Sequence, residues 1–196
     1  MTVVGILLAA GKGRRFDPTG ERNKLLQPWP GAGTVVAASA TAMLAALPRV
    51  VAVVGPDGEG VAAQLRALGC DVTECADAAD GMGVSLAHAL RQVAHDADGW
   101  LIALGDMPRV QPSTIAALAA ALGQGADIAV PVMNGRRGNP VAFSRVHLAA
   151  LLALHGDQGA RHIVRSHPVF EVAVSDPGIF QDIDTAADLN APGVSG

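Results

Sequence analysis

The sequence contains no tyrosine, and aromatic residues of all kinds make up only 3% of its 196 residues. Charged residues are also scarce, at 16%, and the formal net charge is −4. Proteins that bind a nucleic-acid backbone usually carry a surplus of basic residues, so this charge argues against a nucleic acid as the main partner. Half of the residues are hydrophobic, which is enough for a chain of this length to bury a core as one domain.

Cysteines and long apolar runs are few as well. Cys70 and Cys75 are separated by an odd number of positions, so on a strand they point to opposite faces, which argues against a disulfide framework or a zinc site. We therefore expect a reducing cytoplasm. No run approaches the length of a membrane span. The first apolar run, Val3–Ala9, has no basic residue before it and ends at a glycine-rich basic turn, unlike a signal peptide.

Short apolar runs alternate with longer alanine-rich segments in the first two thirds of the chain. This alternation predicts an α/β fold with a parallel sheet and helices on both of its sides. Runs that are apolar on both faces are typical of central parallel strands. The predicted strands are Val3–Ala9, Val50–Val54, Asp71–Cys75, Gly99–Leu104 and Asp127–Val132, and the predicted helices are Thr34–Leu47, Gly58–Leu68, Ser85–His95 and Pro112–Leu122.

The pattern is less regular after Pro131. We interpret residues 1–196 as one domain, with a nucleotide-binding half at 1–110 and an acceptor-binding half at 111–190, and we expect the last six residues to be frayed. In the second half we predict a turn at Met133–Gly138, strands at Pro140–Phe143 and Val169–Val174, and helices at Arg145–Leu154, Gly159–His167 and Ala186–Asn190.

A glycine-rich turn, Gly11-Lys12-Gly13, follows the first predicted strand. Free backbone N–H groups in such a turn can hold an anion. A Walker A loop is absent, and Phe16 occupies the position of the third glycine in a dinucleotide fingerprint. The turn alone is equally compatible with solvated arginines, but the nearby cations, Arg14, Arg15 and Lys24, favour a polyphosphate.

Aspartates occur at two places where a metal ion could bind. Asp106 follows the buried run Gly99–Leu104, and Asp182 and Asp184 lie two apart near the end of the chain. Carboxylates beside phosphates are the ligands that Mg²⁺ prefers. Asp106 could instead be a helix cap or turn residue, and Asp184 could cap the short helix that follows it.

Three further loops carry polar or glycine-rich patterns. Asp80–Leu86 places two glycines and Ser85 at the start of a helix, where a nucleobase edge or an anion could bind, or where the loop simply caps the helix. Gly135–Val141 and Gly156–His162 carry arginines that could bind a second anionic substrate or be solvated. No set of residues suggests a covalent nucleophile.

The chain resembles the MobA-like nucleotidyltransferases, and within them the molybdenum cofactor cytidylyltransferases, in an ordered set of motifs: "LLAAGKGRRF" with Lys24, "DGMGVSL", "ALGDMP", "RGNPVAFS", "GDQGAR" and "DIDT". The resemblance implies a Rossmann-like three-layer α/β sandwich with a mostly parallel central sheet. It implies catalytic roles for Arg15, Lys24 and Asp106, and a Mg²⁺ site at Asp106 and Asp184. The implied nucleotide-binding residues are Leu8, Ala9, Ala10, Gly11, Gly13, Arg15, Lys24, Gly81, Ser85 and Asp106, and the implied acceptor-binding residues are Arg137, Gly138, Asn139, Pro140, Asp157 and Arg161.

Two positions depart from the family pattern. Phe16-Asp17 follows Arg15 where the family usually has Met-Gly, which lengthens the loop before Lys24, and Asn139 stands where the family commonly has histidine. We expect the lengthened loop to be a mobile lid over the triphosphate. The sequence "LAAG" resembles the cytidylyl branch, whereas guanylyl-transferring relatives more often have "LAGG" and so lack the methyl group of Ala10.

The expected activity is Mg²⁺-dependent transfer of CMP from CTP to a phosphorylated pterin, molybdopterin with or without molybdenum, with release of pyrophosphate. Guanylyl transfer, nucleotidyl transfer to a sugar phosphate, and a non-catalytic module that delivers nucleotide or cofactor are the alternatives. The expected partners are CTP or another nucleoside triphosphate, the pterin acceptor, and a molybdoenzyme or its chaperone. A nucleic acid or a membrane is not expected.

Overall fold

The computed structural model describes residues 1–11 and 13–190. Its centre is a sheet with the strand order β10-β7-β9-β6-β1-β4-β5, and β8 pairs with β7. Strands β5, β4, β1 and β6 are mutually parallel, β9 is antiparallel to both β6 and β7, and β10 is parallel to β7. The strands are β1 (Val3–Leu8), β4 (Val50–Val54), β5 (Asp71–Glu74), β6 (Gly99–Leu104), β7 (Ile128–Met133), β8 (Arg136–Arg137), β9 (Val141–Ser144) and β10 (Phe170–Ala173).

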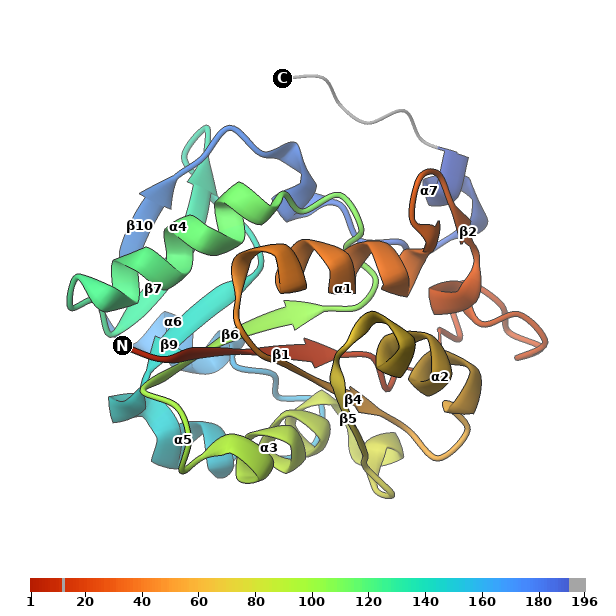
Figure 1. Cartoon of the computed structure of the whole chain (residues 1–196), viewed down its shortest axis with the longest axis horizontal. Helices are drawn as coiled ribbons and strands as arrows, with labels where there is room; N and C mark the ends of the chain where they lie inside the picture. Colours follow the sequence, from red (N-terminus) through yellow and green to blue (C-terminus); the bar gives the residue numbers. More distant parts are fainter. Residues whose placement is uncertain (12, 191–196) are drawn as a thin grey trace.

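Helices cover both faces of this sheet (Figure 1). On one face lie α1 (Val35–Ala46), α2 (Glu59–Leu68) and α4 (Pro112–Gly123). On the other face lie α3 (Met82–Val93), α5 (Leu148–Leu152) and α6 (Arg161–Ser166). The predicted Rossmann-like α/β fold with a mostly parallel central sheet is confirmed.

The alternation of side chains along β1 explains why the sheet is buried on both sides. Val3 and Leu7 belong to the apolar cluster under α1, α2 and α4, whereas Val4 and Ile6 belong to the cluster under α3, α5 and α6. Gly5 lets α1 approach closely, because a Cβ atom there would lie 2.6 Å from Cε of Met43. The central strand therefore anchors both layers and fixes where its own carboxyl end lies.

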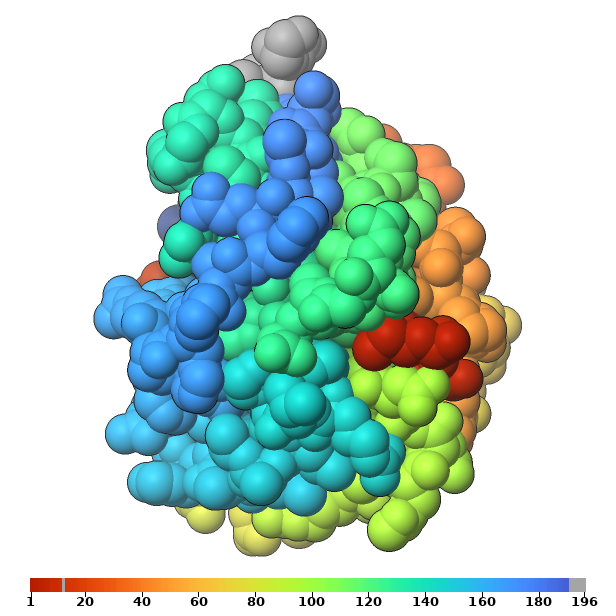
Figure 2. Space-filling view, turned by 90° about the vertical axis from the view of Figure 1, so that its left-hand side faces the viewer, coloured from red at the N-terminus to blue at the C-terminus, as the bar shows by residue number. Residues whose placement is uncertain are grey.

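Segments that are distant in sequence lie together on one side of the molecule. Figure 2 shows the blue part of the chain, which includes β10, against the green part that includes α4 and β7, in keeping with the pairing of Phe170–Ala173 with residues 129–132. The remaining short elements are η1 (Lys24–Leu26), β2 (Pro28–Trp29), β3 (Gly33–Thr34), η2 (Ala78–Asp80), η3 (Arg145–His147), η4 (Pro177–Phe180) and α7 (Ala186–Asn190).

The second half of the chain differs from the sequence-based expectation. The predicted turn at Met133–Gly138 is a hairpin, in which Asn134 and Gly135, at φ 52° and 73°, connect β7 to β8. Positive φ at both central residues fits a two-residue hairpin turn. The predicted helix Arg145–Leu154 divides into η3 and α5, and Gly159–His167 shortens to α6. The predicted frayed end, 191–196, lies outside the described residues.

Cys70 and Cys75 are buried free thiols in the two opposite core clusters. Burial raises the pKa of the Cys70 thiol to about 11, so this thiol is not activated as a nucleophile. None of the helices within 1–11 and 13–190 combines the length and the apolar character needed to span a membrane.

Candidate active site

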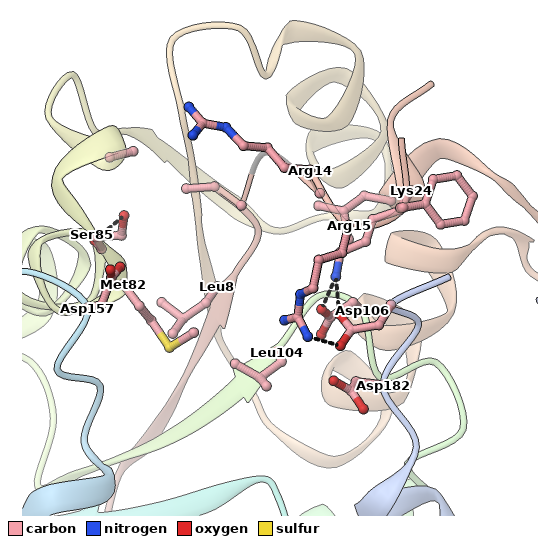
Figure 3. A pocket seen from close by; sticks show the side chains of 18 of the residues that line it. Leu8, Arg14, Arg15, Lys24, Met82, Ser85, Leu104, Asp106, Asp157 and Asp182 are labelled. Atoms are coloured by element: carbon pink, nitrogen blue, oxygen red, sulfur yellow. Dashed lines mark hydrogen bonds and ion pairs between the residues drawn. The ribbon is translucent and has the colours of Figure 1, made fainter. Parts of the chain in front are cut away.

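A cavity of about 580 Å³ lies beyond the carboxyl ends of β1 and β6 (Figure 3). Leu8 and Leu104, the last residues of these two strands, are direct partners in the sheet and both line the cavity. The open end of a parallel sheet is where α/β proteins bind their ligands. Most of the sequence-predicted nucleotide-binding residues line it, namely Leu8, Ala10, Gly11, Gly13, Arg15, Lys24, Gly81, Ser85 and Asp106, together with Asp184.

Lys24 and the two predicted metal-binding aspartates form one charged cluster in this cavity. The Lys24 Nζ atom lies 2.5 Å from Oδ2 of Asp106 and 3.5 Å from Oδ1 of Asp184. Arg15 contacts the other oxygen of Asp184, with 2.6 Å between Nη1 and Oδ2. The Lys24 side chain is only 10% exposed, whereas that of Arg15 is 81% exposed. Figure 3 shows Arg15 directed toward the carboxylates and Arg14 directed away from them.

The backbone brings the two aspartates together although they are far apart in sequence. The N–H of Ile183 donates to the carbonyl oxygen of Asp106 at 2.8 Å, and the Ile183 side chain is fully buried. On the other side, the buried hydroxyl of Ser39 in α1 donates to the carbonyl of Gly105 at 3.0 Å. Asp106 and Asp184 therefore project from segments that the core holds in place.

Asp184 does not cap the short helix α7. That role belongs to Asp188, whose Oδ2 accepts hydrogen bonds from the hydroxyl and the N–H of Thr185 and from the N–H of Asp184. These bonds, led by that of the Thr185 hydroxyl, lower the pKa of the Asp188 carboxyl. Thr185 and Asp188 form a capping pair, and the Asp184 carboxylate is left to face Arg15 and Lys24.

The lengthened loop before Lys24 turns back toward the sheet. Phe16 is buried in the core. The Asp17 carboxylate accepts hydrogen bonds from the Thr19 hydroxyl and N–H and from the N–H of Arg22, and these bonds, led by that of the Thr19 hydroxyl, lower its pKa. The start of the loop is thus anchored in the core, and Lys24 reaches the cavity in spite of the added length. The mobile lid stays a prediction.

The carboxylates suit a hard divalent cation. Oδ1 of Asp106 is buried and has no hydrogen-bond partner among the described residues. An unpartnered carboxylate oxygen is costly, and a metal ion would satisfy it. The described residues contain no group of three histidine, cysteine or acidic side chains placed to hold a metal. Two carboxylates fit a Mg²⁺-type site in which substrate phosphates and water supply the other ligands.

Two of the sequence motifs, "DGMG" and "GDQG", pack directly on each other. Gly81 has φ 126°, and a Cβ atom there would overlap the carbonyl group of Gly156. The N–H of Gly83 donates to the carbonyl of Gly156 at 2.9 Å. Ser85, one turn into α3, is buried and lines the cavity. Only glycine fits this close contact, which holds the start of α3 and the 156–158 segment together.

A second cavity of about 730 Å³ adjoins the first. The two share five lining residues: Leu8, Met82, Leu104, Asp157 and Arg161. The second cavity also contains the predicted acceptor-binding residues Arg137, Gly138 and Asn139, and its further basic side chains are His162 and Arg165. Arg137 is ion-paired with Glu171 at 2.8 Å.

Two predicted residues lie behind the cavities. Ala9 is buried, and its N–H donates to the carbonyl of Val53. Pro140 is buried, and together with Ser39 it lines a separate small pocket. Neither residue lines either of the two cavities.

Sequence reasoning missed several lining residues, among them Met82, Leu104, Arg165 and Gln158. Leu104 carries a usable signal, since it is the last apolar residue of a strand that is followed directly by "GDMP". Met82 lies between the two glycines of "DGMG", and only the fold brings that position to the junction of the cavities.

A family model, curated proteins and solved structures all match nearly the whole length of this chain. The family description "MobA-like NTP transferase domain" matches residues 5–172. The chain is 30% identical to the purine catabolism protein PucB of Bacillus subtilis, covering 96% of this chain and 94% of that protein, and 30% identical to nicotine blue oxidoreductase of Paenarthrobacter nicotinovorans, covering 95% and 94%. It is also similar to the crystal structure of Rv0371c from Mycobacterium tuberculosis, with a TM-score of 0.84 and 32% identity over 97% of this chain and 96% of that one. Rv0371c has also been crystallised in complex with manganese.

Proposed function

The chain belongs to the MobA-like NTP transferase family, and on this basis we propose that it transfers CMP from CTP to a phosphorylated pterin, with Mg²⁺ as the metal ion and pyrophosphate as the leaving group. The observation that carries this proposal is the pair of adjoining cavities, one with the Lys24–Asp106–Asp184 cluster and the other with several basic side chains.

The reaction needs alignment of two anions and no covalent enzyme intermediate. The terminal phosphate of the acceptor would attack the α-phosphorus of CTP, and the bond to the β-phosphate oxygen would break. Arg15 and Lys24 would contact the phosphates and stabilise the departing pyrophosphate. The matching family is described as a MobA-like NTP transferase domain, and the described residues of the cavity offer groups suited to this chemistry.

Asp106 and Asp184 would hold the divalent metal, which neutralises phosphate charge when it is bound. The unpartnered Oδ1 of Asp106 supports this assignment, and the manganese complex of Rv0371c supports dependence on a divalent metal. Mg²⁺ itself is our proposal, because it prefers carboxylate oxygens combined with phosphate and water.

The preference for CTP over GTP is attributed to Ala10. This residue lines the first cavity and is half-buried, so its methyl group reduces the space for a base at the glycine-rich turn. A pyrimidine needs less room than a purine. We expect the same preference to disappear in a variant that lacks the methyl group.

A phosphorylated pterin suits the second cavity in two respects. Arg137, Arg161 and Arg165 could contact phosphate, and apolar side chains of the cavity wall, such as Ile102 and Val130, could contact the ring system. The motifs "RGNPV" and "GDQGAR" add the resemblance to the cytidylyl branch. We further propose that the product passes to a molybdoenzyme or its chaperone in the cytoplasm.

The test is an assay of pyrophosphate release from CTP with Mg²⁺ and molybdopterin, run in parallel with GTP and with a sugar phosphate as acceptor. The proposal requires CTP with molybdopterin to be the best pair. Faster turnover with GTP or with the sugar phosphate would assign another transfer within the family. Binding of CTP without pyrophosphate release would indicate a delivery module. One relative is named an oxidoreductase, so consumption of NAD(P)H should be measured as well. Consumption of NAD(P)H would overturn the proposal that the protein is a transferase.

A further inference from the structure

The two carboxylates expected to bind the metal are already occupied by cations of the chain itself. The Lys24 ammonium lies between them, 2.5 Å from Asp106 and 3.5 Å from Asp184, and Arg15 contacts Asp184 at 2.6 Å. Two negative charges thus face two positive charges, and the cluster is balanced without a metal or a nucleotide. A divalent ion can enter only if at least one of the cations moves.

We propose that Lys24 is an internal counter-ion that blocks the metal position until a nucleoside triphosphate draws its ammonium group away, so that the metal binds these carboxylates only after the nucleotide or together with it. This proposal depends on the proposed function in one respect: it takes a nucleoside triphosphate as the molecule that moves Lys24.

Burial makes Lys24 an effective competitor for the metal. Its side chain is 10% exposed, and those of Asp106 and Asp184 are 20% and 25% exposed. Charges that are withdrawn from water are poorly screened by solvent and salt. A divalent ion on the same carboxylates would lie within a few ångströms of the ammonium group and be strongly repelled by it. Arg15 is 81% exposed, so its pairing with Asp184 is screened and is a weaker obstacle.

The position of the Lys24 side chain also explains why a triphosphate would move it. A Cβ atom added to Gly13 would lie 3.2 Å from Cγ of Lys24, so the lysine stem runs directly beside the glycine-rich turn expected to hold phosphates. The ammonium group could therefore exchange a carboxylate for a phosphate oxygen by rotation of its side chain alone. Lys24 satisfies only one oxygen of Asp106, since Oδ1 has no partner among the described residues, and the metal would complete this carboxylate once the lysine has moved.

The experiment measures Mn²⁺ binding to nucleotide-free protein, by electron paramagnetic resonance of the free ion. The proteins compared are the wild type, Lys24→Met, Lys24→Gln, Lys24→Arg and Arg15→Ala. Arg49→Ala is the matched control, because Arg49 also bridges two carboxylates, those of Asp71 and Asp96, at the surface away from the cavity.

We expect the two neutral Lys24 variants to bind Mn²⁺ at least about tenfold more tightly than the wild type. Arg15→Ala should improve binding by no more than about threefold. Lys24→Arg retains the positive charge and should resemble the wild type, as should Arg49→Ala. Equal Mn²⁺ affinity in the wild type and in folded Lys24→Met or Lys24→Gln would overturn the proposal.

The wild type alone provides a second test that does not depend on the stability of the variants. Without nucleotide it should bind Mn²⁺ only weakly, and a non-hydrolysable CTP analogue should bind in the presence of EDTA and then raise the affinity for Mn²⁺ at least about tenfold. Strong Mn²⁺ binding by the nucleotide-free wild type, abolished by Asp106→Asn, would refute the blocked site. Failure of the analogue to bind would count against CTP as substrate, whereas the nucleotide-free comparison would still decide the role of Lys24.

Discussion

Replacement of Asp106 by alanine should separate activity from folding. The variant loses the carboxylate expected to bind the metal, and the loss of one metal ligand should cost about 4 kcal/mol of transition-state stabilisation, or roughly a thousandfold in rate. The backbone contact that holds this region, from the N–H of Ile183 to the carbonyl of Asp106, does not involve the side chain. The fold should therefore survive.

The effect of the same substitution on stability can be bounded from the contacts of Lys24. Removal of the Asp106 carboxylate leaves this 10% exposed lysine with Asp184 as its remaining acidic partner, at 3.5 Å. A weakened but retained partner implies a loss of about 1–3 kcal/mol in the free energy of unfolding. For a chain of this size, the corresponding decrease in Tm is about 2–12 °C.

The assay pairs pyrophosphate release with thermal unfolding for Asp106→Ala and Asp184→Ala, at a temperature well below both transitions. Both variants should lose activity, Asp184→Ala less severely, and both should unfold cooperatively. Near-normal pyrophosphate release by Asp106→Ala would refute the metal assignment. If Asp184→Ala lowers only the Tm, then Asp184 has a structural role in holding Arg15 and Lys24.

Three further predictions concern other parts of the molecule. Ala10→Gly should reduce the preference for CTP over GTP in competition assays, because it enlarges the cavity at the glycine-rich turn; an unchanged ratio would show that Ala10 does not select the base. Gly81→Ala should lower the Tm and the activity together, because its methyl group would overlap the carbonyl group of Gly156, whereas Gly123→Ala, which meets no neighbouring atom within 4 Å, should leave both nearly unchanged. Burial, with a smaller contribution from His167, lowers the pKa of His147 from its usual 6.5. The neutral ring therefore stabilises the fold fully above about pH 6.5. This contribution decreases as the pH falls through that value toward the lower pKa of the folded state. The decrease in Tm between pH 7 and 5 should therefore be smaller in His147→Asn than in the wild type, and the exposed His155→Asn should show the full decrease.

The sequence is most informative for the central strands, because their apolar pattern agrees with their buried position in the sheet. Val3–Leu8 and Gly99–Leu104 are apolar on both faces, as central strands must be, and the polar loops after them lie at the edge of the sheet where a cavity forms. β9 was harder to predict, because its four residues do not reveal that it is inserted antiparallel between β6 and β7. The pair Asn134-Gly135 is typical of a two-residue hairpin turn, which is more specific than the general turn predicted at Met133–Gly138.

Contacts between distant segments could not be predicted in detail. Gly81 and Gly156 are far apart in the sequence. Only the fold shows that Gly81 must be a glycine because the carbonyl group of Gly156 lies against it. In the same way, Asp188 rather than Asp184 caps α7, a distinction that depends on side-chain direction. The loop before Lys24 is another case: Phe16 is buried in the core cluster under α1, α2 and α4, and the Asp17 carboxylate accepts a hydrogen bond from the N–H of Arg22.

The direction of β9 separates two kinds of variation in this protein. β9 runs antiparallel to its neighbours, with Val141 opposite Ile102 and Ser144 opposite Gly99. The loop of β9 that lies at the site therefore comes before the strand in sequence, whereas the loops of the parallel strands β1 and β6 come after them. The hairpin that precedes β9 can therefore change in length or sequence without altering the turn after β1 or the aspartate after β6. A chimera that exchanges only residues 133–140 with those of a relative should change the choice of acceptor and keep the choice of nucleotide. On the proposed function, the hairpin on the acceptor side and the turns on the nucleotide side belong to separate segments of the chain, although the two cavities share five lining residues.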